Sequence, residues 1–178
     1  MTSVIVQLIL ALLLLVCAIR VQRSSGLPRS RTWGQIMRRI VPGHNHLAAL
    51  SYGCVFSEGI ECSSTDLWTN IGGLEGLLWI YRNTGVLLNA IDYIELSCPP
   101  SAVISSAMEA LRRDAANVRI VALVTLVRQS VRYVLGDSHT LLKETAGSYF
   151  SFISHLGLAI HDYRPELLAD FAFPMSQV

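Results

Sequence analysis

The chain has 178 residues, enough for one domain of ordinary size. Hydrophobic residues make up 52% of it and charged residues only 15%, which excludes an intrinsically disordered protein. The formal net charge of +1 conceals an asymmetry, because all 13 acidic residues lie at position 58 or later.

The N-terminal segment is the most apolar part of the sequence. Residues 2–19 contain no charged residue and only one side-chain amide, Gln7. A helix of this length is roughly 27 Å long, close to the hydrocarbon thickness of about 30 Å. A cleaved signal peptide and a buried helix are the alternatives, but the basic residue that normally precedes a signal peptide's apolar run is missing. We therefore expect residues 1–19 to be a single transmembrane anchor.

Basic residues flank this predicted span on one side only. Because positive residues near a span favour the cytoplasmic side, we expect a single-pass membrane protein with its body in the cytoplasm. Three cysteines follow the span, an odd number that gives no disulfide framework and fits a reducing compartment. The arginines either fix this topology alone or also bind anionic lipid, and they give little support to a nucleic-acid partner. They are Arg20, Arg23, Arg29, Arg31, Arg38 and Arg39.

Residues 20–43 are expected to be a basic juxtamembrane linker that ends in a short amphipathic helix. Two interpretations of this helix are open. It docks on the body of the protein, or it lies on the membrane with Trp33 toward the lipid boundary and Arg38 and Arg39 toward the headgroups. These three residues are the lipid-facing candidates. The apolar residues that share one helical face are Trp33, Ile36, Met37, Ile40 and Val41.

Residues 44–178 predict a compact all-α domain of five to seven helices, because apolar residues recur at helical spacing between turn signals. Ser101 is a candidate N-cap after two prolines, the last long helix is expected over residues 140–163, and a short helical turn follows Pro165. Residues 118–127 are rich in β-branched side chains and are compatible with a strand. The helical spacing continues beyond them, which favours a helix.

Two breaks are predicted where the apolar stripe changes side by about 160°. We expect a turn or kink at residues 83–85 and another at residues 115–118. Three nearby glycines are expected to permit close approach of a neighbouring helix: Gly72, Gly73 and Gly76. The stripes before and after the first break are Leu67, Ile71, Leu74, Leu78 and Tyr81, and then Leu87, Leu88, Ile91 and Ile94. Those around the second break are Ile104, Met108, Leu111 and Ala115, and then Ile120, Val124, Val127, Val131 and Leu135.

The sequence contains ligand-type residues but no recognised catalytic or cofactor motif. Ser151, His155 and Asp162 have the residue types of a catalytic triad, but seven helical residues separate His155 from Asp162 by about 10.5 Å. There is no phosphate-binding loop and no dinucleotide fingerprint, so we expect no cofactor. The spacing of the one metal-like cluster does not match structural zinc sites, so we expect no metal; its residues are His44, His46, Cys54 and Cys62.

The sequence does not establish a biochemical activity. It best supports a membrane-tethered interaction module (an adaptor, scaffold or small subunit of a membrane assembly) with the bilayer and a protein partner or second copy as partners. The alternative is a membrane-anchored enzyme; a transmembrane sensor has few residues outside. A cavity that holds a histidine beside a carboxylate favours the enzyme, and a flat exposed apolar patch favours the module. The dispersed acid–base candidates are His44, His46, His139, His155, His161 and Glu75.

Overall fold

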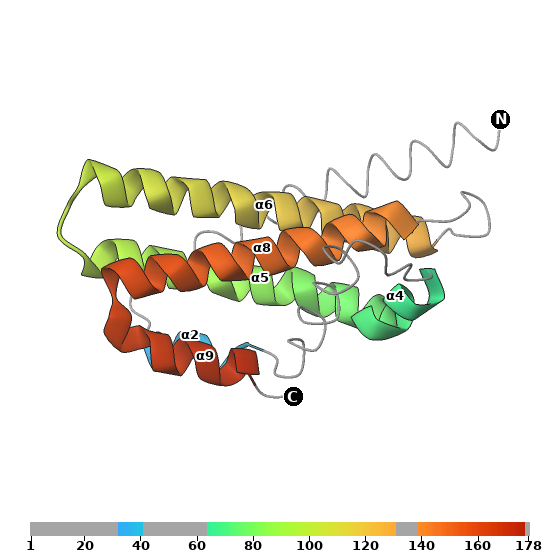
Figure 1. The fold of residues 1–178 in the computed structure, drawn as a ribbon, viewed down its shortest axis with the longest axis horizontal. Helices are drawn as coiled ribbons and strands as arrows, with labels where there is room; N and C mark the ends of the chain where they lie inside the picture. The colour runs from blue at the N-terminus through green and yellow to red at the C-terminus, as the bar shows by residue number, and fades with distance from the viewer. Residues whose placement is uncertain (1–31, 41–63, 131–138, 177–178) are drawn as a thin grey trace, which may run out of the picture. The chain divides into compact units, whose positions relative to one another are not determined.

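The computed structural model describes residues 32–40, 64–130 and 139–176, which belong to one unit comprising residues 31–178. Three long helices lie side by side within it (Figure 1): α5 (Gly73–Ser97), α6 (Ala102–Ser130) and α8 (His139–Tyr163). The shorter helices are α2 (Trp33–Met37), α4 (Ser64–Ile71), η1 (Pro165–Leu167) and α9 (Leu168–Ser176). The described ranges contain no strand, which confirms the all-α class and excludes a strand at residues 118–127.

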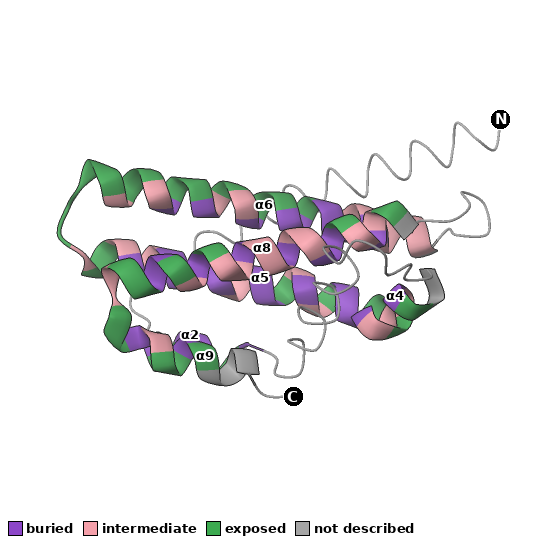
Figure 2. Ribbon diagram, in the orientation of Figure 1, coloured by how far each residue is buried: buried purple, intermediate pink, exposed green. Residues whose placement is uncertain are grey.

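The three long helices enclose the main apolar core. α6 contacts both α5 and α8, and α5 also contacts α8 directly. Figure 2 shows buried residues along all three helices, with exposed residues on their outer sides. No helix in the described ranges is long and apolar enough to cross a bilayer. The predicted span at residues 2–19 lies outside the described residues.

The connection between α5 and α6 follows the sequence prediction. The Cys98 backbone nitrogen still donates to the Ile94 carbonyl at 3.1 Å, and two prolines then prevent continuation of the helix. α6 begins directly after Ser101, whose carbonyl accepts from the Ser105 nitrogen at 3.0 Å. This short loop places α5 and α6 next to each other in opposite directions, as Figure 1 shows.

The predicted break at residues 83–85 is wrong, because α5 runs without interruption through it. Asn83 and Thr84 are buried within the apolar stripe, and the Thr84 hydroxyl donates to the Ile80 carbonyl at 2.7 Å. By contrast, Leu74 and Leu78 are 43% and 47% exposed. The buried stripe is therefore continuous, and its members are Gly76, Leu77, Ile80, Asn83, Thr84, Leu87, Ala90, Ile91 and Ile94.

The chain instead turns at Gly72 and Gly73, between α4 and α5. Their φ angles of 78° and 65° lie in the left-handed region, which glycine adopts without the strain of a Cβ atom. A Cβ atom on Gly76 would lie 1.5 Å from the Ile71 carbonyl oxygen, so a side chain is excluded there. The expected close approach thus occurs at Gly76, and the approaching helix is the end of α4.

The predicted break at residues 115–118 is also wrong, because α6 is continuous from Ala102 to Ser130. The buried stripe continues on the same side through Val118, Ala122 and Thr125, whereas Ile120 is 61% exposed. A buried threonine thus occupies a position where the sequence pattern pointed to a polar surface. In both helices the predicted shift of the apolar stripe was wrong for the same reason. Some polar residues lie in the core, and some apolar residues lie on the surface.

Candidate functional site

The neck helix α2 docks on the protein through Trp33. Trp33 is 4% exposed, and its ring centroid lies 5.6 Å from that of Tyr93 on α5. Ile36 and Ile40 are buried as well, and α2 also contacts α9. A five-residue helix has little stability alone in water, so burial against its neighbours provides most of its stability. The expectation that Trp33 faces lipid is therefore wrong, and the docking interpretation describes this structure.

The other two lipid-facing candidates have a different environment. Arg38 and Arg39 follow α2 and are both exposed. The Arg38 nitrogen donates to the Gly34 carbonyl at 3.1 Å, and the Arg39 nitrogen then donates to the Ile36 carbonyl at 3.0 Å, so the helix ends in a tighter turn. Contact of these two arginines with anionic headgroups remains a prediction.

Polar side chains inside the bundle pair with one another. The Thr125 and Thr145 hydroxyl oxygens lie 2.9 Å apart across the α6–α8 contact. Each oxygen also lies within hydrogen-bond distance of a carbonyl in its own helix, at 2.8 Å from Val121 and 2.7 Å from Leu141, so one hydroxyl donates to its carbonyl while the other donates across the contact. Buried polar groups are tolerated when they are hydrogen-bonded, so this pair fixes the register of α6 against α8 at little cost.

A second polar pair joins α5 and α8. Tyr149 is 2% exposed and forms a side-chain hydrogen bond with Asn83. Burial raises the pKa of Tyr149 to about 12, since the charged phenolate is disfavoured away from water, and the hydrogen bond acts in the opposite direction. The neutral phenol is thus a structural hydrogen-bonding group at neutral pH.

Arg119 is the most unusual buried group in the described core. It is 6% exposed, and its guanidinium carbon lies 4.4 Å from the centre of the Tyr81 ring on α5. Its Nε atom is enclosed without a hydrogen-bond partner among the described residues. A Cβ atom placed on Gly85 would lie 3.8 Å from the guanidinium carbon, an ordinary contact distance, so the guanidinium packs over the α5 backbone at Gly85. The ring face compensates part of the desolvation cost through a cation–π interaction.

A different arginine, Arg112, holds the other end of the α5–α6 contact. Its Nη2 atom lies 2.7 Å from an Asp92 carboxylate oxygen and also bonds Glu95, while Glu109 lies 3.9 Å from Nη1. The hydrogen bond from Arg112 lowers the pKa of Glu95. Partial burial lowers the pKa of Arg112, but its bonds to Glu95 and Asp92 outweigh this effect and raise it.

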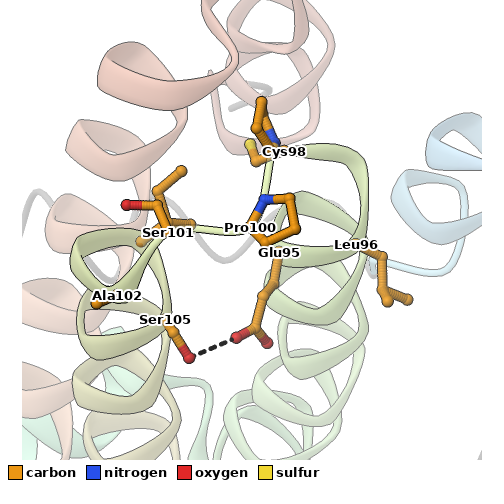
Figure 3. Close-up of a pocket in the computed structure, with 9 residues that line it drawn as sticks. Glu95, Leu96, Cys98, Pro100, Ser101, Ala102 and Ser105 are labelled. Carbon is orange, nitrogen blue, oxygen red and sulfur yellow. Dashed lines mark hydrogen bonds between the residues drawn. The ribbon is translucent and has the colours of Figure 1, made fainter.

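A cavity of about 560 Å³ lies beside this ion network, at the loop between α5 and α6 (Figure 3). The Ser105 hydroxyl donates to Glu95 there at 3.1 Å, shown as a dashed line. The Cys98 sulfur lies 3.9 Å from the Tyr163 carbonyl oxygen and is a free thiol. The Glu95 carboxylate in the cavity is already paired with Arg112, and none of the described histidines lines the cavity, so the described residues offer no acid–base pair there.

A smaller cavity, of about 270 Å³, lies between α6 and α8 and does contain such a pair. The His155 Nδ1 atom lies 3.2 Å from an Asp114 carboxylate oxygen, and both side chains are about half exposed. Ser151 lines the same cavity, but Asp162 does not. The sequence analysis noted Ser151 and His155 only within a triad that helix geometry disfavours, and it did not name Asp114, because a contact between two helices leaves no local spacing signal.

The remaining sequence candidates do not assemble into a site. Glu75 and His161 are exposed on different helices. Within the described ranges, no group of three or more histidine, cysteine, aspartate or glutamate side chains is placed to hold a metal ion. Five candidates lie outside the described residues or side chains: His44, His46, Cys54, Cys62 and His139.

Comparisons with known protein families, with curated proteins and with solved structures gave no match for this chain. The function must therefore be inferred from its own residues.

Proposed function

We propose that this chain is a membrane-tethered helical interaction module, with a bilayer anchor at residues 1–19 and its body on the cytoplasmic side. The observation that carries the proposal is the docking of α2 on the bundle through Trp33. Only about 13 residues, Arg20–Thr32, separate the predicted span from this docked helix. At most about 3.6 Å per residue, they reach roughly 45 Å, so the bundle would be held near the membrane surface.

Charge and exposure support the same proposal. Arg38 and Arg39 are exposed next to the docked helix, in a neck that has no acidic residue to neutralise them. A basic surface close to a bilayer attracts anionic lipid by about 1 kcal/mol per residue. Large apolar side chains on the described surface offer a contact for a second protein or a second copy, among them Leu78 and Ile120, at 47% and 61% exposed.

The test uses the full chain, expressed in membranes, cross-linked and purified in mild detergent, with the mass of the complex measured by light scattering. We expect a complex with one stoichiometric partner or a second copy. The double variant Leu78→Gln with Ile120→Gln should lose this complex, and Leu158→Gln, which changes another exposed leucine, should keep it. A wild-type monomer without partner, or equal behaviour of all variants, would contradict the proposal.

An enzyme is the second candidate function, and one observation favours it. Of the dispersed histidines, His155 stands beside a carboxylate, that of Asp114, in a cavity. This arrangement is the feature that distinguishes the enzyme from a pure interaction module.

A further inference from the structure

The cavity between α6 and α8 is lined by five polar side chains, which carry four kinds of functional group. Asp114 and Asn117 come from α6, three residues apart, so they lie on neighbouring positions of one helical face. Ser148, Ser151 and His155 come from α8, and Ser151 lies four residues before His155, so these two are likewise neighbours. Two continuous helices thus present one carboxylate, one amide, two hydroxyls and one imidazole to a single small space.

The contact between Asp114 and His155 determines what the imidazole can do. A carboxylate accepts hydrogen bonds, so at 3.2 Å it favours the neutral tautomer that carries its proton on Nδ1. The Nε2 atom of that tautomer keeps a free lone pair and can act as a base. Because the two residues belong to different helices, the packing of α6 on α8 holds the ring in this orientation.

Ser151 lies one helical turn before His155 on α8 and lines the same cavity. Side chains in a helix lean toward its N-terminus, so the His155 ring is inclined toward the turn that contains Ser151. Asn117 adds an amide N–H donor from the opposite helix. Backbone N–H groups inside both helices are used in helical hydrogen bonds, so donors to a developing oxyanion must come from side chains, and the Asn117 amide is one that lines the cavity.

We propose that this cavity is a hydrolytic site for small neutral esters, an inference that rests on the second candidate function. Ser151 is the nucleophile, His155 the general base and acid, Asn117 the oxyanion donor, and Asp114 the positioning residue. A space of about 270 Å³ suits an acyl group of a few carbons. Among the described residues one carboxylate lines it, that of Asp114, and it disfavours anionic substrates.

The reaction balances with water as the co-reactant. The Ser151 hydroxyl proton passes to His155 Nε2 while its oxygen bonds the ester carbonyl carbon. The C–O bond to the alcohol then breaks, and the alcohol leaves with the proton from Nε2. Water attacks the acyl-serine in the same way, with its proton passing to Nε2, and releases the carboxylic acid and free Ser151.

The test measures hydrolysis of p-nitrophenyl acetate and butyrate by the full chain in detergent, together with labelling by a fluorophosphonate mapped by mass spectrometry. We expect saturable hydrolysis and a label on Ser151. Ser151→Ala and His155→Asn should lower kcat/KM about 100-fold or more, and Asn117→Ala about 10-fold. Asp114→Asn should lower kcat with KM and thermal unfolding unchanged.

The matched controls change the same residue types on α8 outside the cavity lining: Ser154→Ala, His161→Asn and Asp162→Asn. All three should retain wild-type kcat/KM. Hydrolysis that survives Ser151→Ala, or a label on another residue, would overturn this site but leave an enzyme elsewhere in the chain possible. Ester hydrolysis no faster than in buffer would overturn the site as well, without bearing on other substrates of the second candidate function.

Discussion

Arg112 and Arg119 lie two helical turns apart on the same side of α6, but residues of α5 give them different partners. Arg112 keeps 30% of its side chain exposed and binds the carboxylates of Asp92 and Glu95. Arg119 is 6% exposed and has the Tyr81 ring in place of a carboxylate. The same residue type is thus held by ion pairs where water reaches it, and by an aromatic face where water is excluded.

This difference has an energetic meaning. An ion pair near water is screened and contributes about 1 kcal/mol or less. A buried guanidinium cannot lose its charge, so its desolvation is a cost that a ring offsets only in part. We infer that the Arg112 contact is mildly stabilising, whereas Arg119 is held in place at a net cost.

Tyr81→Ala tests the ring and should have the largest effect. The variant removes a half-buried aromatic side chain and the cation–π contact together, so we expect the free energy of unfolding to fall by about 3 kcal/mol. Urea unfolding followed by circular dichroism measures it. Tyr81→Phe is the matched control, since it keeps the ring, and should stay within about 0.5 kcal/mol of wild type. An equal loss of unfolding free energy in both variants would show that the Tyr81 ring does not account for the effect of Tyr81→Ala.

Arg119→Met should act in the opposite direction. An unbranched apolar side chain fills similar space without a charge to desolvate, so we expect the free energy of unfolding to rise by about 1–2 kcal/mol. The same urea titration measures the gain. A loss of stability would mean that the Arg119 guanidinium makes a favourable interaction that outweighs its desolvation cost.

Arg112→Met should have the smallest effect, a loss of about 1 kcal/mol or less that shrinks in 1 M salt. Its dependence on pH is more diagnostic. Arg112 lowers the pKa of Glu95, so the pair contributes stability above the ordinary value of 4.5 and loses it as pH falls through the lowered pKa. Wild type should therefore lose more stability than the variant between pH 7 and pH 3. Parallel acid profiles would show that Glu95 gains nothing from Arg112.

The sequence predicted the helical class and several helix limits because these depend on local signals. The prolines after Cys98 and the apolar spacing up to Tyr163 are examples, and both limits agree with the structure. The internal breaks could not be predicted correctly, since Asn83 and Thr125 are polar residues whose burial depends on partners in other helices. A search for apolar residues at helical spacing assigns polar residues to the surface. The predicted stripe was therefore assigned to nearby apolar residues on the exposed side of each helix.

The candidate site was only partly predictable for the same reason, because it also depends on a contact between helices. Ser151 and His155 share a helical face and were visible in the sequence, but Asp114 reaches His155 only through the packing of α6 on α8. Trp33 was ambiguous for a related reason. Its helical face is equally suited to lipid and to protein, and only the contact with Tyr93 decides between them.

The contact between α2 and α9 joins the first and last described helices of the unit. A ribosome makes α2 before all the other described helices, so its contact with α9 cannot form until α5, α6 and α8 have been synthesised. Until then one neighbour of α2 is missing. The packing of the neck helix is therefore completed only after the three long helices exist.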